Sequence, residues 1–325
     1  MRSKFIFFVF NLAIVILISC DSKLKEEKIS VQKKKVTFSE NQKAFRTRIK
    51  SITEYYHAVS YGKVDSIGIK SKYKLYDTFG NKVLEINYSN SKKSKKDEIY
   101  SKKEFIYNCK NNLKERIEMD SNNKIVIHEY YFYNDLGLLK ELDHQNPIGK
   151  GSNNVYYKYN SNNLLSEKTQ YDNDGKFQHK EVFEYDSLNN VKKFKKFDSN
   201  SRLIKSENYN YDKASNLTKK EEYNFAYRSD REITIYIYTY KYDIEGNLIE
   251  ECEYLPKYFY AERKTPSFFI KNKYNDNGEK IESEMNNQGI IKFIYDKKSN
   301  LIENINYINV QGIVSSEKYY IEYYE

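Results

Sequence analysis

The sequence predicts an all-β protein, a long antiparallel meander built from repeats of about 26 residues. One motif returns nine times along the 325 residues: a Tyr, then Asp or Asn, and three residues later Gly, Asn or Ser. Successive copies lie 31, 26, 26, 26, 26, 31, 32 and 21 residues apart. The intervening segments are rich in Tyr, Phe, Ile and Val, which favour strands, and no 3.6-residue apolar stripe indicates a helix. The nine motif tyrosines are Tyr76, Tyr107, Tyr133, Tyr159, Tyr185, Tyr211, Tyr242, Tyr274 and Tyr295.

Each copy of the motif has the chemistry of a hairpin turn. Asp or Asn is favoured at the first position of a type I turn, because its side chain binds the backbone two residues on. Gly and Asn tolerate the positive φ that is needed when such a turn closes a hairpin through a G1 bulge. The motif therefore predicts a turn, with these residues as its clearest members: Tyr107 and Asn108, Tyr133 and Asn134, Tyr185 and Asp186, Tyr211 and Asp212, Tyr242, Asp243 and Gly246, Tyr295 and Asp296.

The flanks of the motif predict strands. Two residues before the Tyr the side chain is aromatic in seven copies, and period-two alternation places both rings on one face. A second, looser turn follows about twelve residues after each Tyr, as at 172–175 and 198–201. Nine units of two strands each imply roughly 18 to 20 strands, whereas open sheets rarely exceed about 10 without curling or splitting. We therefore expect a strongly twisted or coiled sheet, or two facing walls.

The two ends of the array are also predicted to be strands. Residues 48–61 provide an initial strand or strand pair, and the aromatic run 319–324 provides the last one. An exposed aromatic edge strand invites pairing with another chain. Closure against a neighbouring strand of the same protein is the alternative. With 34 Tyr and no Trp, the array predicts a thin core in which Tyr covers a sheet face while its hydroxyl stays in water.

The motif resembles the YD repeats of bacterial Rhs-type proteins. Residues 242–248, Tyr-Asp-Ile-Glu-Gly-Asn-Leu, fit that signature best, and the resemblance covers about residues 73 to 325. The chain departs from it by using Asn for Asp in four copies and by rarely having the Arg that often follows the Gly. Family members with long arrays wrap into hollow shells that enclose a toxin. We do not expect that role here, because the array is short and no toxin-like domain follows it.

The N-terminus predicts export and lipidation. Arg2 and Lys4 precede a nearly continuous apolar run at 5–18, and Leu-Ile-Ser-Cys ending at Cys20 is similar to the lipobox of bacterial lipoprotein precursors. A membrane-spanning helix is the alternative, but the run is short against the roughly 20 residues that a bilayer requires. The predicted organisation is a signal peptide at 1–19, lipidated Cys20 with a polar tether at 20–45, and one β-repeat domain at 46–325.

The expected location is the cell envelope, with the membrane as a partner through the lipid anchor. Outer-membrane surface and periplasmic face both remain open. The lysine-rich tether is either a solvated spacer or a contact with anionic headgroups. No nucleic-acid partner is expected, because the formal charge of +9 is spread over a chain with 46 acidic residues. Cys109 and Cys252 lie five units apart, so no disulfide is expected unless the sheet closes on itself.

The sequence carries no catalytic or metal-binding signature, so no enzyme activity, cofactor or metal is predicted. The four histidines, at 57, 128, 144 and 179, share no ligand spacing. Calcium would suit the oxygen-rich Asp and Asn turns, but hairpin chemistry already explains those residues. Cleavage of glycans would need two carboxyl groups about 5 to 9.5 Å apart across a groove.

Two segments break the period and are candidates for recognition. Residues 89–98 form a lysine-rich insertion, and 255–269 holds two of the three prolines. Insertions in repeat arrays often lie on the binding face, and aromatic anchors with an Arg suit recognition. The alternative is that these aromatics fold back onto the sheet. The candidate binding-loop residues are Tyr258, Phe259, Tyr260, Arg263, Phe268 and Phe269.

Two hypotheses of function follow. The first is a lipid-anchored β-repeat protein that acts as a non-catalytic binding or scaffolding surface for protein or glycan. The second, by analogy with the use of Rhs-like repeats in bacterial competition, is a periplasmic immunity-type inhibitor of a toxin.

Overall fold

A computed structural model of the chain describes residues 48–60, 63–89, 97–147, 151–225, 233–254, 265–286, 288–308 and 312–324. All regular elements in these ranges are β-strands. Among the residues so described, no helix is long and apolar enough to cross a membrane. The strands are β1 (Ile49–Ser60), β2 (Lys63–Val64), β3 (Ile69–Tyr76), β4 (Lys82–Tyr88), β5 (Ile99–Tyr107), β6 (Leu113–Asp120), β7 (Ile125–Tyr133), β8 (Leu139–Gln145), β9 (Asn153–Tyr159), β10 (Leu165–Asp172), β11 (Phe177–Tyr185), β12 (Val191–Phe197), β13 (Leu203–Tyr211), β14 (Leu217–Phe225), β15 (Ile233–Tyr242), β16 (Leu248–Tyr254), β17 (Phe268–Tyr274), β18 (Lys280–Met285), β19 (Gly289–Tyr295), β20 (Leu301–Ile308) and β21 (Gly312–Tyr323).

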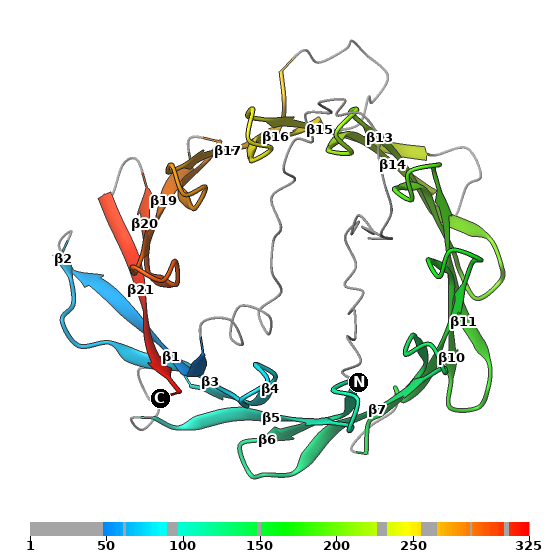
Figure 1. Cartoon of the computed structure of the whole chain (residues 1–325), viewed down its shortest axis with the longest axis horizontal. Coiled ribbons are helices and arrows are strands. Elements are labelled where there is room, and N and C mark those ends of the chain that lie inside the picture. Colours follow the sequence, from blue (N-terminus) through cyan, green and yellow to red (C-terminus); the bar gives the residue numbers. More distant parts are fainter. Residues whose placement is uncertain are drawn as a thin grey trace, which may run out of the picture.

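The strands form a closed barrel (Figure 1). From β3 to β21 each strand pairs antiparallel with the next, and β1 completes the ring by pairing with β3 on one side and β21 on the other. The short β2 pairs with the end of β1 and stands outside the ring of twenty. The all-β prediction is confirmed. The expectation of an open, twisted or coiled meander was wrong, because the first and last strands pair with each other and leave no free edge.

The C-terminal aromatic strand closes the ring instead of offering an edge to another chain. Its register against β1 runs from Ile49↔Tyr323 to Ala58↔Ser315. The other side of β21 pairs with β20, so the strand is bonded on both sides. Of the two alternatives for this strand, closure within the protein is the one found.

The motif forms a hairpin turn in all nine copies. At Asp186 the side-chain Oδ1 accepts hydrogen bonds from the N–H of Leu188 at 2.9 Å and of Asn190 at 2.8 Å. The Asn189 N–H donates to the Asp186 carbonyl at 3.1 Å, and Asn189 has a φ of 63°. The predicted positive φ occurs in every copy, at Gly80, Asn111, Gly137, Asn163, Asn189, Ser215, Gly246, Gly278 and Ser299.

All nine motif turns lie at one end of the barrel, because each follows an odd-numbered strand from β3 to β19 in an antiparallel meander. We call this end, made by the turns at 77–81, 108–112, 134–138, 160–164, 186–190, 212–216, 243–247, 275–279 and 296–300, the motif rim. The chain also enters the wall here. The Tyr324 N–H donates to the Arg48 carbonyl at 2.7 Å, one residue before β1 begins.

The motif Tyr joins successive units. Tyr185, for example, donates its hydroxyl to the Leu165 carbonyl at 2.7 Å, at the start of β10 in the preceding unit. Its hydroxyl is therefore bonded to backbone, not left in water as the composition had led us to expect. The same bond links Tyr107 to Lys82, Tyr133 to Leu113, Tyr159 to Leu139, Tyr211 to Val191, Tyr274 to Leu248 and Tyr295 to Lys280.

The wall has a thin core, as the composition predicts. Among the described residues only Ile49, Tyr76, Val155 and Cys252 are buried apolar side chains. Twenty strands about 4.8 Å apart give a perimeter of about 96 Å and a diameter of at least about 31 Å, which is too wide for one layer of side chains to fill. Both faces of the wall are accordingly accessible. We call the face that carries the motif tyrosines the tyrosine face, and the other the opposite face.

Candidate binding site

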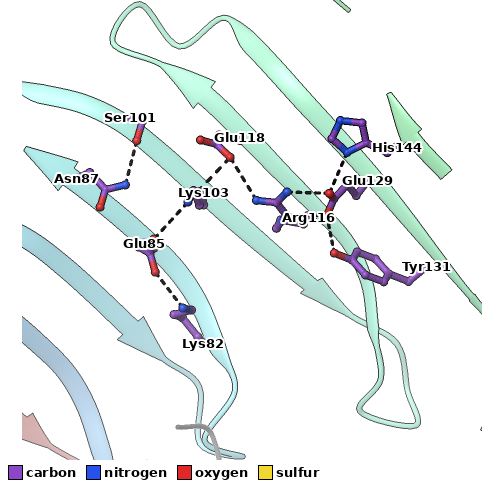
Figure 2. A network of polar contacts seen from close by, with 10 residues as sticks. All are labelled: Lys82, Glu85, Asn87, Ser101, Lys103, Arg116, Glu118, Glu129, Tyr131 and His144. Carbon is purple, nitrogen blue, oxygen red and sulfur yellow. Dashed lines mark hydrogen bonds and ion pairs between the residues drawn. The ribbon is translucent and has the colours of Figure 1, made fainter. Parts of the chain in front are cut away.

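A polar cluster around Glu129 dominates the tyrosine face. The register places Arg116 of β6 and His144 of β8 directly across from Glu129 of β7. Arg116 holds the carboxylate through two bonds, Nε to Oε2 at 2.7 Å and Nη2 to Oε1 at 2.8 Å. His144 Nδ1 lies 3.0 Å from Oε1, and the Tyr131 hydroxyl donates to Oε2 at 2.5 Å. Figure 2 shows the four side chains converging.

These contacts shift the protonation equilibria of the cluster. Burial alone would raise the pKa of Glu129, which is 7% exposed, but bonds from Arg116, Tyr131 and His144 lower that pKa to about 2. Burial and the bond to Glu129 together raise the pKa of Tyr131 above its ordinary value. The bond to Glu129 outweighs burial and raises the pKa of Arg116. Glu129 is therefore a permanently charged acceptor near neutral pH, not a proton donor or base.

The cluster belongs to a larger array of ion pairs on the same face. Glu118 lies between Arg116 at 3.2 Å and Lys103 at 4.0 Å, and Lys103 also reaches Glu85 at 3.6 Å (Figure 2). Each carboxylate in this array contacts at least one cation, so the array reinforces the wall rather than exposing a reactive group. We call it the charge belt, with the carboxylates Glu85, Glu118, Glu129, Glu181, Glu207 and Glu222 and their partners Lys82, Lys103, Arg116, Lys168, Lys196 and Lys205.

The opposite face carries a cleft of about 520 Å³ between β9 and β10 and the turn that follows β10. The rings of Tyr156 and Tyr171 meet edge to face with centroids 5.8 Å apart, and Phe177 extends the aromatic surface 6.0 Å from Tyr171. Polar groups surround these rings, including Lys158 and Glu167, which form an ion pair at 2.8 Å. The remaining lining residues are Asn154, Thr169, Asp172, Asn173 and Gly175.

This lining has the chemistry of a ligand site. Its volume lies within the range of about 300 to 1,000 Å³ typical of small-molecule sites, and its lining of two aromatic rings and six polar side chains is more polar than the usual one. The rings offer flat apolar surface, while the amide, ammonium and hydroxyl groups offer hydrogen bonds. A saccharide, with apolar C–H faces and a rim of hydroxyls, matches both requirements.

The predicted binding-loop residues are only partly within the described chain. Four of them lie outside it, namely Tyr258, Phe259, Tyr260 and Arg263. The predicted lipidation residue, Cys20, also lies outside it. Phe268 and Phe269 begin β17, where they pair with Glu253 and Cys252. Being neighbours in a strand, they point to opposite faces, so they form no joint aromatic patch. The lysine-rich insertion at 89–98 is also largely outside the described residues.

The cysteines and histidines gather no metal site in the described ranges. Cys109 is exposed in a motif turn, Cys252 is buried in β16, and both are free thiols. His128 contacts Glu115 at 3.1 Å and His144 contacts Glu129, which gives both rings local partners. Across this part of the chain, no three His, Cys, Asp or Glu residues lie together in a way that could hold an ion.

Sequence reasoning missed both the charge belt and the cleft. The belt does leave a signal, since Glu129, Glu181 and Glu207 each stand four residues before a motif Tyr and so share its face. The cleft leaves none, because Tyr156 and Tyr171 meet only through the register of β9 on β10.

Comparison with known proteins adds little beyond the fold. No family model and no curated protein matches the chain. The crystal structure of TcdB2-TccC3 is similar at 11% identity and a TM-score of 0.39, covering 83% of this chain and 20% of that one. The TcdB2-TccC3-Cdc42 structure gives 11% identity, a TM-score of 0.36, and 78% and 18% coverage. A porin-like protein from Bacteroides uniformis gives 10% identity and a TM-score of 0.35, with 85% and 98% coverage. The chain thus spans about a fifth of the toxin chains it matches, and the shared feature is a β-rich fold.

Proposed function

We propose that this protein is a lipid-anchored component of the cell envelope whose closed β-wall is a non-catalytic binding surface for glycan. The observation that supports this most directly is the aromatic and polar cleft at Tyr156 and Tyr171. Support for the anchor is the lipobox-like sequence ending at Cys20. A rigid wall with a shallow site on one face suits capture and display of a ligand outside the cytoplasm. In this proposal the resemblance to YD-repeat proteins extends to architecture and not to toxin enclosure.

The carboxylates of the cleft favour binding over cleavage. A glycosidase needs a general acid whose pKa is raised, and a second free carboxylate across the sugar. The hydrogen bond from Lys158 instead lowers the pKa of Glu167. Asp172 is engaged in its own turn, where its Oδ1 accepts from the Lys176 N–H at 2.9 Å and its Oδ2 from Gln178 at 2.8 Å. Both groups therefore have structural partners and are unsuited to proton transfer.

Titration calorimetry with neutral disaccharides, cellobiose and N,N′-diacetylchitobiose, tests the glycan proposal. We expect binding by the native protein and its loss in Tyr156→Ala and in Tyr171→Ala. Tyr100→Ala removes an aromatic that is 70% exposed on the same face but lies on β5, four strands from the cleft, and it serves as the matched control. The proposal is refuted if neither sugar binds, or if the two tyrosine variants bind as well as the control.

The anchor is tested separately in the native host. Metabolic labelling with radioactive palmitate should mark the protein and should fail in Cys20→Ala. Protease treatment of intact cells then distinguishes the outer surface, where the protein is lost, from the periplasmic face, where it is protected.

A further inference from the structure

A row of three side chains crosses the opposite face beside the cleft. The register places Glu141 of β8 directly between Phe132 of β7 and Tyr156 of β9. Both rings reach the surface, since Phe132 is 49% exposed and Tyr156 is 38% exposed. Neighbouring strands lie about 4.8 Å apart, so the rings stand one on each side of the carboxylate, with about 9.6 Å between their strands. Tyr156 also lines the cleft, and the row therefore continues the cleft across β8.

The carboxylate in this row lacks the cation that other glutamates of the same face have. Glu104, Glu184 and Glu250 pair with lysines at 2.5, 2.7 and 2.5 Å. Within the described ranges, no Lys, Arg or His nitrogen lies within 4.0 Å of the Glu141 carboxylate, which is half-buried. An ionised carboxylate forms its strongest hydrogen bonds with charged donors, so Glu141 can accept a cation from outside the wall.

The wall shows elsewhere what a cation does opposite an aromatic residue. Lys220 lies directly opposite Tyr238, and its Nζ stands 3.9 Å from the centre of that ring. Lys180 lies directly opposite Phe197, with its Nζ 5.7 Å from the ring centre. Cross-strand neighbours on one face thus bring an ammonium group over a ring. At Glu141 the central residue is an anion with a ring on each side, so the ammonium group that suits this position would come from a ligand.

The charges around the cleft favour an amine on the β8 side. On the β10 side, Glu167 is held by two lysines, Lys158 at 2.8 Å and Lys180 at 3.8 Å, which would repel a further cation. On the β8 side, a cation above Glu141 would stand one strand spacing, or about 4.8 Å, from the strands that carry the two rings. Aromatic rings attract a cation within about 6 Å, and the carboxylate adds charge-assisted hydrogen bonds.

We propose that Phe132, Glu141 and Tyr156 form an amino-sugar subsite, which binds the free amine of a glucosamine unit next to the sugar held in the cleft. The ammonium group donates to the Glu141 carboxylate, and the two rings flank it. This inference rests on the glycan proposal above and specifies the class of glycan, one that carries unacetylated amino sugars.

Titration calorimetry compares the β-1,4-linked glucosamine disaccharide with N,N′-diacetylchitobiose, at a pH where the amines are protonated. We expect the native protein to bind the glucosamine disaccharide about tenfold more tightly, because an exposed ion pair and an exposed cation–π contact each contribute modestly. Glu141→Gln should bind the two sugars equally, and Phe132→Ala should reduce the preference. The matched control is Glu104→Gln, which removes a carboxylate from the same face on β5 and should keep the full preference.

Equal binding of the two disaccharides by the native protein, or a preference that persists in Glu141→Gln, would overturn the amino-sugar subsite and leave the glycan cleft intact. Binding of Nα-acetyl-lysine amide as tightly as the glucosamine disaccharide would overturn it in favour of a basic peptide as the ligand. Failure of both disaccharides to bind would refute the glycan proposal and this inference with it.

Discussion

Changing Glu129 to Gln tests whether the charge belt stabilises the wall. The substitution keeps the shape of the side chain but removes the charge that Arg116 and His144 face. Arg116 then keeps only Glu118, at 3.2 Å, as a partner among the contacts described. Removing one partner of a largely buried ion pair lowers the free energy of unfolding by more than the net contribution of the pair, because the remaining charge is then buried without a counter-charge.

The expected magnitude follows from the pKa of Glu129. Lowering the pKa of Glu129 from an ordinary 4.5 to about 2 corresponds to about 3.4 kcal/mol, since each tenfold change in the acid dissociation constant is worth about 1.36 kcal/mol. Arg116 and His144 are each 21% exposed, and allowing for solvent screening lowers this to about 2 kcal/mol. Because the folded pKa is depressed, the contribution is complete above pH 4.5 and is lost as the pH falls through about 2.

Urea unfolding of the native protein and of Glu129→Gln, followed by tyrosine fluorescence between about pH 7 and pH 2, measures this difference. We expect a gap of about 2 kcal/mol at neutral pH that closes toward pH 2. Glu184→Gln is the control, since Glu184 pairs with Lys195 at 2.7 Å but is 49% exposed, and it should cost under about 1 kcal/mol. A Glu129→Gln gap no larger than the control, or one that does not change with pH, would refute the reasoning.

Two further predictions concern the repeat itself. Tyr185→Phe removes the hydroxyl that reaches the Leu165 carbonyl and should lower the free energy of unfolding by about 1 kcal/mol in the same urea assay, whereas no change would mean that the bond between units is not stabilising. At Asn189, where φ is 63°, a change to Gly should be neutral within a few tenths of a kcal/mol and a change to Val should cost about 1 to 2 kcal/mol; equal stability of the two variants would contradict the turn assignment.

The parts of the fold that local chemistry specifies could be predicted from the sequence. The Asp186 side chain can accept hydrogen bonds from the backbone N–H groups that follow it, and Asn189 tolerates a positive φ. The two residues at this spacing therefore predict a turn. Period-two alternation then orders the strands on both sides of each turn. The first strand, expected at 48–61, is found as β1 at Ile49–Ser60 for the same reason.

Closure of the barrel could not be predicted, because it depends on the geometry of all the strands together. Ile49 and Tyr323 form a strand pair although almost the entire array separates them in sequence, and the residues around either one give no sign of this pairing. Whether they meet depends on the small twist between neighbouring strands, added over twenty strands. The cleft has the same origin on a smaller scale, since one residue of slip between β9 and β10 would turn Tyr156 and Tyr171 to different faces.

The seam is held by the same chemistry that joins the repeats. Tyr323 donates its hydroxyl to the Asp296 side chain at 2.9 Å and accepts from the Asn300 side chain at 2.8 Å, so it contacts the last motif turn through side chains, whereas a motif Tyr contacts a backbone carbonyl. Tyr324 reaches the carbonyl of Tyr76, the first motif tyrosine. A wall with a thin core gains little from apolar burial, so paired backbone and hydroxyl-to-backbone bonds must supply most of its cohesion. An open sheet would leave the backbone N–H and C=O groups on one side of its first and last strands without partners. Pairing of β21 with β1 removes both edges at once, because β1 bonds the last unit as the strand of a further repeat would have done.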